Sequence, residues 1–513
     1  MYKKFLIVCF LMLCTASLFA QIQSMEVTQK FYPNPDMTFS TPTLSIAQDR
    51  FASYQEIMEW ISSRALKDDR MSVEMVGVSS KGREIPMIKL SNRNNDASKI
   101  KVWMQGAIHG NEPAGAEGLF MLTDYILNNE AGGKYLDKID LYILPMANID
   151  GYFADTRASA DGYDLNRDQT KFADKESVII KKAFMAVNPD VAIDFHEFSP
   201  IRKEVAFIGE KGGAIYYDVL FLPTGYPNVP KALRKATIKY LQTPAEKKLD
   251  KAGYSHFFYF SIDDSGEEPV LAKGAKSPQS SSTSYSLSNA ISILVEIRGI
   301  KFGRLSLERR TNSVFIVAES ALEQTYNHSK AIRKIVDKSI NRTIQRRDNI
   351  SVTGVSSEKR LPVQFVDFAT NELVEKNLLV KDALEYKSLI VRDRPIGYII
   401  EKGEEAAIDN LKTLGIDIIE IEEDWNADVE SYKVIEYTTA KKSWEKIHRA
   451  AVKTEIIKQN KIFPKGSYWI RLNQENANFA VSVLEPESDN GFVTFRVIDT
   501  EKGEILPIHR VMK

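Results

Sequence analysis

The chain has very little cysteine. Of its 513 residues only Cys9 and Cys14 are cysteines, and both lie close to the N-terminus. Beyond Cys14 the sequence therefore excludes a disulfide framework, a cysteine nucleophile and a thiolate metal site. An uncrosslinked chain must rely on a large apolar core, which this length permits. Any transition-metal site must use histidine, aspartate or glutamate.

The chain also lacks an excess of charge of either sign. It carries 68 lysines and arginines against 69 aspartates and glutamates, for a formal net charge of −1. This balance argues against a nucleic acid or an anionic membrane surface as a partner. The 43% of hydrophobic and 27% of charged residues are typical of a globular protein with two or more domains.

The N-terminal apolar run is too short for a comfortable membrane span. The segment "MYKKFLIVCFLMLCTASLFAQ" has a basic start, an apolar run from Phe5 to Cys14 and small residues up to Ala20. It predicts a signal peptide over residues 1–20 and an exported chain, periplasmic or extracellular, with no membrane span after cleavage. An uncleaved anchor is the alternative, and Leu13 before Cys14 argues against a lipid anchor.

Apolar strands and amphipathic helices alternate between Val102 and Arg298. Strands are predicted at "KVWMQGAI", "KIDLYILPMAN", "PDVAIDFHE" and "NAISILVEIRG", and helices at "PAGAEGLFMLTDYILNN" and "KESVIIKKAFMAVN". This pattern predicts an α/β domain with a mixed, mostly parallel sheet covered by helices. A further helical pattern, "SVFIVAESALEQTYNHSKAIRKIVDKSINRTIQRRD", closes the domain, which we expect to cover residues 21–346.

Two regions depart from this alternation. Residues 199–288 interrupt it, and their serine-rich part, "AKGAKSPQSSSTSYS", predicts a mobile loop of the kind used as a lid or binding loop. Residues 347–513 predict a smaller accessory module of β or α+β character. It has a strand–helix–strand pattern in "PIGYIIEKGEEAAIDNLKTLGIDIIEI" and half-exposed strands in "SYWIRLNQ", "FAVSVLEPES" and "GFVTFRVID".

Histidine and glutamate residues follow or end three of the predicted strands. His109 and Glu112 lie in "GAIHGNEPAG", His196 ends "AIDFHEF", and Glu296 ends "ILVEIRG". Because the carboxyl ends of parallel strands meet at one edge of a sheet, we expect all four side chains to gather there. The glycines around His109 permit a tight turn, and this turn lets the side chains of His109 and Glu112 point to the same place.

Two histidines and one carboxylate are the ligand set of a catalytic zinc site that keeps one position open for water. His109, Glu112 and His196 are the predicted ligands of one zinc ion, which would lower the pKa of that water to roughly 7. Glu296 is then the predicted general base, which takes the water's proton and returns it to the leaving amine.

Each signal also has an ordinary explanation. A histidine and a glutamate three residues apart are typical of a polar turn with a capping glutamate, and His196 on its own fits a hydrogen-bonded core histidine. The carboxylate of Glu296 lies among apolar residues and needs a partner, which either catalysis or a salt bridge supplies. The shared placement at strand ends favours the metal site.

Five ordered motifs resemble those of the zinc metallocarboxypeptidases, the carboxypeptidase A-like peptidases: "GAIHGNEPAG", "LPMANIDGY", "GYDLNRD", "DFHE" and "LVEIRG". The resemblance covers about residues 45–345. It implies the zinc ligands and base named above, and it implies that Arg157 polarises the scissile carbonyl. It also implies that Asn166 and Arg167 grip the C-terminal carboxylate of the substrate, with Asp164 orienting a ligand histidine. Tyr285 is the nearest candidate for a substrate-closing tyrosine.

The leading hypothesis is an exported zinc metallocarboxypeptidase that hydrolyses the C-terminal bond of peptides with a free C-terminus. A zinc deacylase or amidase on the same fold is the alternative. An inactive peptide- or glycan-binding module is disfavoured, because the ligands and the base are all present. The sequence leaves open the side-chain preference, the role of the C-terminal module and the oligomeric state.

Overall fold

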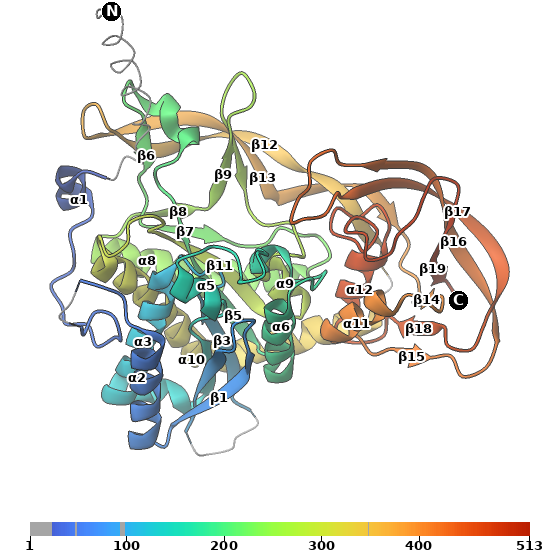
Figure 1. Ribbon diagram of the computed structural model, residues 1–513, viewed down its shortest axis with the longest axis horizontal. Coiled ribbons are helices and arrows are strands. Elements are labelled where there is room, and N and C mark those ends of the chain that lie inside the picture. The colour runs from blue at the N-terminus through green and yellow to red at the C-terminus, as the bar shows by residue number, and fades with distance from the viewer. Residues whose placement is uncertain (1–22, 47–48, 93–97, 347) are drawn as a thin grey trace, which may run out of the picture.

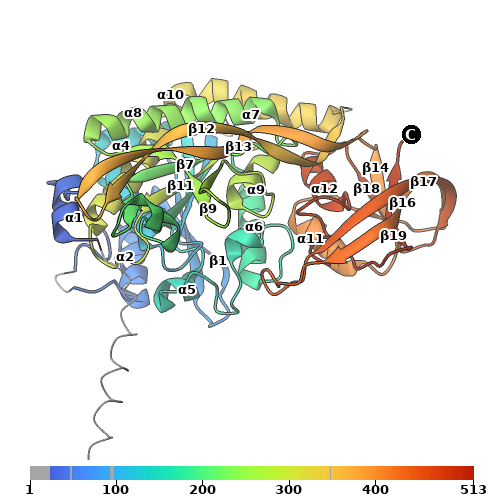
Figure 2. The same ribbon diagram turned by 90° about the horizontal axis from the view of Figure 1, so that it is seen from above.

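The computed structural model describes residues 23–46, 49–92, 98–346 and 348–513 (Figures 1 and 2). The predicted signal peptide at residues 1–20 lies outside these ranges. Within them, no helix combines the length and the apolar character that crossing a membrane requires.

The centre of the structure is an eight-stranded mixed sheet. Its strands, in spatial order, are β1 (Met71–Val78), β2 (Glu84–Leu90), β4 (Ile139–Leu144), β3 (Ile100–Gly106), β5 (Val191–Phe198), β11 (Ile291–Arg298), β7 (Val219–Leu222) and β8 (His256–Phe258). The four middle strands, β4, β3, β5 and β11, run parallel. The outer strands β1 and β2 are antiparallel, as is β7 against β11. The predicted fold class is confirmed.

Helices cover this sheet so completely that every residue of β5 and β11 is buried (Figure 2). This explains why both strands have unbroken apolar sequences rather than alternating ones. The long helix α10 packs against α3 and α8, whereas α6 and α9 contact each other through stacked rings of Phe184 and Tyr285. The bounds are α3 (Pro113–Asn128), α6 (Lys175–Val187), α8 (Thr243–Ala252), α9 (Ser281–Leu287) and α10 (Leu307–Gln345).

The prediction of a mobile loop is wrong for the serine-rich second half of its segment, whereas residues 276–280 before it form turns without regular structure. Residues 281–287 form α9, and each of them is buried. Their hydroxyl groups find partners inside the protein: Ser281 donates to Asp194, and Ser284 accepts a hydrogen bond from Lys181. A serine-rich composition permits burial when each hydroxyl is hydrogen-bonded in this way.

A second sheet lies above the eight-stranded sheet in the view of Figure 1 and joins segments that are far apart in sequence. Its strands, in order, are β6 (Gly213–Ile215), β12 (Ile350–Asp367), β13 (Glu372–Arg392), β10 (Val270–Lys273) and β9 (Phe260–Asp263). The long hairpin of β12 and β13 therefore pairs with the 199–288 interruption on both of its sides. Whether residues 347–513 fold separately stays a prediction.

The C-terminal region forms a six-stranded sheet with two helices. The elements are β15 (Ile419–Glu420), β18 (Tyr468–Arg471), β14 (Gly397–Ile400), β19 (Ile505–Val511), β16 (Trp425–Thr439), β17 (Ala450–Phe463), α11 (Glu405–Thr413) and α12 (Ala477–Leu484). The strand–helix–strand prediction and the strand at "SYWIRLNQ" are confirmed.

Two other strand predictions in this region are wrong. The segment "FAVSVL" belongs to helix α12, and "GFVTFRVID" forms successive turns. The first segment is fully buried and the second is mostly buried, with Arg496 and Asp499 exposed, so neither has the alternating solvated face of a half-exposed strand.

Candidate metal centre and substrate cavity

The turn that follows β3 depends on close backbone packing. A Cβ atom on Gly110 would lie 1.9 Å from the carbonyl carbon of Gly151, and one on Gly106 would lie 2.8 Å from that of Gly115. Both distances are shorter than non-bonded contact allows, so these positions need glycine. Ala107 adopts a positive φ of 50° in the same turn. The tight turn predicted from the glycines is present.

This turn brings His109 and Glu112 together with His196 at the end of β5. His109 Nδ1 lies 2.7 Å from Glu112 Oε1, and His196 Nδ1 lies 3.0 Å from Glu112 Oε2. The two Nδ1 atoms are 3.1 Å apart, and all three side chains are buried. Glu112 precedes α3, yet its side chain makes no capping hydrogen bond, which excludes the capping explanation. The three residues offer ligand atoms that lie within 4.8 Å of one another.

The arrangement fits a cation. His109 Nε2 lies 3.0 Å from Asp164 Oδ1, and His196 Nε2 lies 2.8 Å from Asp194 Oδ2. A carboxylate at each Nε2 favours the proton there, which leaves both Nδ1 atoms with lone pairs. Two imidazole lone pairs and a carboxylate then converge without a proton between them, and this donor set suits zinc.

Glu296 lies on β11 directly opposite His196 in the parallel register of β5. Its side chain lines the cavity described below and is 8% exposed. Burial raises the pKa of Glu296 to about 7. A carboxylate with such a pKa is suited to accept and return a proton near neutral pH.

Arg157 and Asp164 form a fork beside the histidines. Arg157 Nε and Nη2 lie 3.0 and 2.8 Å from Asp164 Oδ2, and Nη1 lies 3.2 Å from His109 Nδ1. The Arg157 side chain stays 43% exposed, so it remains accessible from the cavity. Asp164 therefore contacts a predicted ligand histidine and this arginine at the same time.

Asn166 and Arg167 follow Asp164 in a short 3-10 turn. Asn166 is buried, and its Oδ1 accepts a hydrogen bond of 2.8 Å from the backbone N–H of Ser281 on α9. Within the described ranges the Arg167 guanidinium makes one hydrogen bond, from Nη1 to the Asn166 carbonyl at 2.9 Å. Both residues line the cavity, as the resemblance implied.

The cavity has a volume of about 420 Å³ and is bordered by His109, Arg157, Arg167 and Glu296. Tyr285 does not line it. Tyr285 is 1% exposed, and its hydroxyl donates to Gln105 Oε1 at 2.6 Å.

A different tyrosine, Tyr259, lines the cavity from the segment between β8 and β9. Burial, reinforced by the charge of Glu296, raises the pKa of Tyr259 to about 12, so its hydroxyl keeps its proton. The motif spacing did not find Tyr259, because a long interruption separates the tyrosines from the motifs.

Two further residues that sequence reasoning missed come from the C-terminal region. Glu445 Oε2 accepts a hydrogen bond of 3.0 Å from the Asp164 backbone N–H, and Lys446 Nζ donates to the Asp161 carbonyl. Both residues form the two-residue turn between Trp444 and Ile447, with φ of 48° and 63°. Such a turn favours glycine or asparagine, so two charged residues there carry backbone strain.

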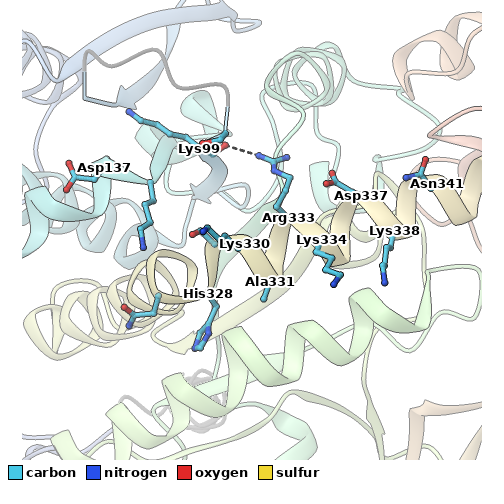
Figure 3. A pocket seen from close by; sticks show the side chains of 14 residues that line it. Lys99, Asp137, His328, Lys330, Ala331, Arg333, Lys334, Asp337, Lys338 and Asn341 are labelled. Carbon is cyan, nitrogen blue, oxygen red and sulfur yellow. Dashed lines mark hydrogen bonds between the residues drawn. The ribbon is translucent and has the colours of Figure 1, made fainter.

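A larger hollow of about 740 Å³ lies elsewhere, along α10 (Figure 3). Arg333 crosses it to the carbonyl of Lys99 and forms a salt bridge with Asp190. Five of its fourteen lining residues are lysines, and the lining includes neither the histidine–glutamate cluster nor Glu296. Size alone therefore does not locate the chemistry.

Comparison with known proteins agrees with this geometry. The family model described as zinc carboxypeptidase matches residues 57–189, which include His109, Glu112, Arg157, Asn166 and Arg167. The chain is 29% identical over 441 residues to "Carboxypeptidase 2" of Trichophyton rubrum, covering 84% of this chain and 81% of that protein. It is 28% identical over 415 residues to "Probable carboxypeptidase 2" of Arthroderma benhamiae, covering 79% and 78%.

Among solved structures, a putative carboxypeptidase A from Shewanella denitrificans aligns with 55% of this chain and 69% of its own. The TM-score is 0.41 and the identity 21%. The family match covers the turn that bears two of the proposed ligands, and the relatives align over most of the sequence, so the chain is similar to zinc carboxypeptidases in the region of the site.

Proposed function

We propose that this chain is an exported zinc metallocarboxypeptidase that hydrolyses the C-terminal bond of peptides. The observation that carries the proposal is the convergence of the His109–Glu112–His196 cluster and Glu296 on a cavity that also exposes Arg167. The cluster can hold one zinc ion, and the arginine can hold a carboxylate.

One zinc ion held by His109 Nδ1, Glu112 and His196 Nδ1 would supply a water of lowered pKa and polarise the scissile carbonyl. Glu296 lines the cavity, where it is placed to accept a proton and to deliver it to the departing amine. Its pKa near 7 suits both transfers. Asp164 and Asp194 fix the tautomers of the two histidines through their Nε2 atoms.

The substrate is positioned by the residues around the cavity. Arg167 offers a planar fork to the terminal carboxylate, with Asn166 beside it. Arg157 is placed next to His109, where negative charge develops on the carbonyl oxygen of the scissile bond. The protonated hydroxyl of Tyr259 can donate a hydrogen bond to the substrate, which gives it the role that the sequence assigned to Tyr285.

The exopeptidase claim is tested with paired peptides that end in a free carboxylate or an amide. We expect the wild-type protein to cleave only the free form, and Arg167→Ala to lose most of that activity through a higher KM. Arg360→Ala, which removes an arginine from the exposed pair with Glu268, is the control. Equal cleavage of both peptides, unaffected by Arg167→Ala, contradicts the proposal.

The purified protein also tests whether the enzyme is instead a deacylase and whether its signal peptide is removed on export. A panel of acylated amino acids separates a deacylase from a peptidase, because only a deacylase prefers them over peptides. We expect the exported protein to begin at Gln21, which N-terminal sequencing reads directly. An exported protein that begins at Met1 contradicts cleavage of the leader.

A further inference from the structure

Three arginines surround one side of the substrate cavity. Arg157, Arg167 and Arg202 all line it, and each acts electrostatically on Tyr259, which lines the same cavity. Lys276 adds a fourth cation to the lining. A peptide with an uncharged side chain brings only one carboxylate, at its C-terminus, to this cluster.

Two of the arginines already have partners or roles. Arg157 is forked onto Asp164, and its charge is directed to the scissile carbonyl. Arg167 is the residue proposed to hold the terminal carboxylate. Neither assignment uses Arg202.

Arg202 lies six residues beyond His196, directly before the 3-10 helix Lys203–Ile208. Its Nε and Nη2 atoms are buried and have no hydrogen-bond partner, and no carboxylate of the described residues lies within 4.0 Å of its guanidinium. Glu197, a nearby carboxylate of the cavity, is held by Arg310 at 2.6 Å and by the backbone N–H of Ala114. Two buried donors of Arg202, Nε and Nη2, therefore have no acceptor among the described residues.

Buried charged donors without acceptors are costly, and the cost is recovered when a ligand supplies an anion. An arginine fork binds a carboxylate through two parallel hydrogen bonds. The volume of about 420 Å³ accommodates a side chain next to the scissile bond. An oxygen anion of the substrate satisfies these requirements.

We infer that Arg202 forms a second anion-binding subsite, which selects peptides that carry an acidic side chain at their last or penultimate residue. This inference rests on the proposed carboxypeptidase function, and it adds the substrate class. Lys276 strengthens the same field without forming the fork.

The test compares peptides that differ only in Glu or Gln at the last position, and a second pair that differs in the same way at the penultimate position. We expect kcat/KM to favour Glu at one of the two positions by about 10- to 100-fold, the range of a charge-assisted hydrogen-bonded pair. In Arg202→Gln this ratio should fall toward one. The preference should also weaken with added salt.

Lys203→Gln is the matched control, because Lys203 is the adjacent residue, is exposed and does not line the cavity. It should keep the Glu-to-Gln ratio of the wild type. Equal rates for Glu and Gln at both positions overturn the inference, as does a preference that survives Arg202→Gln. If neither Glu nor Gln peptides are cleaved, the carboxypeptidase function itself fails, which is a distinguishable result.

Discussion

Replacing Lys181 by methionine tests the cost of a charge buried where α6 packs against α9. Lys181 is fully buried on α6, and its Nζ donates to Ser284 Oγ at 2.8 Å. The rings of Phe184, Tyr285 and Phe479 surround the same atom at 5.3, 5.7 and 4.5 Å from their centroids. Burial lowers the pKa of Lys181 from 10.5 to about 7.

This lowered pKa determines how much the buried charge costs in folding free energy and how that cost changes with pH. A fall of about 3.5 pKa units costs about 5 kcal/mol of folding free energy at or below pH 7, at 1.36 kcal/mol per unit. Between pH 7 and pH 10.5 the unfolded chain binds more protons than the folded one, so this cost shrinks as the pH rises. Lys181→Met removes the cost but also removes the hydrogen bond to Ser284, worth about 1 kcal/mol.

We therefore expect Lys181→Met to stabilise the protein by a few kcal/mol at pH 7. That advantage should shrink by about 1.4 kcal/mol for each pH unit above 7. The measurement is urea unfolding of both proteins from pH 6 to pH 9. Lys182→Met, which changes the exposed neighbour on the same helix, should show no such slope. A stability difference that stays constant with pH refutes the reasoning.

Three further outcomes follow from the site. Glu296→Gln should keep its bound zinc, by metal analysis, but lose at least about 100-fold in kcat, because proton transfer disappears; no zinc in either protein would contradict the site. Gly110→Ala should lower the free energy of unfolding by about 3 kcal/mol or more and weaken zinc retention, since its methyl group meets the Gly151 backbone; an unchanged melting temperature would contradict this. Glu445→Ala should raise KM several-fold at unchanged zinc content, because Asp164 loses its acceptor, and Glu445→Gln should restore most of the binding; equal KM values for all three proteins would exclude a positioning role.

The sheet and the metal cluster were predictable because they depend on local patterns. Strands such as β5 and β11 are buried on both faces, so their apolar runs stand out in the sequence. Parallel strands also place their ends at one edge, which brought His109, His196 and Glu296 together in the prediction and does so in the structure. The geometry depends on strand direction, which the alternation of strands and helices indicated, and on strand order, which only the structure gives.

Other features depend on contacts that no local pattern records. Tyr285 and Tyr259 both lie in the long interruption, and the sequence does not distinguish between them. Packing places Tyr285 against the ring of Phe184 and Tyr259 at the border of the cavity. The serine-rich helix α9 was mistaken for a loop because its hydroxyls find partners on remote elements. The segment of α12 was mistaken for a strand because complete burial removes the amphipathic period that distinguishes the two.

The strained turn at Glu445 and Lys446 has a consequence for the order in which the protein becomes competent. The residues that form the metal cluster are synthesised early, whereas the turn that holds the Asp161–Asp164 segment is synthesised much later. A chain that is still emerging, or that has lost its C-terminal region to proteolysis, would carry every proposed ligand and yet lack the two contacts that hold the backbone of Asp161 and Asp164. The backbone position of the Asp161–Asp164 segment thus depends on residues that follow it by more than 280 positions in the chain.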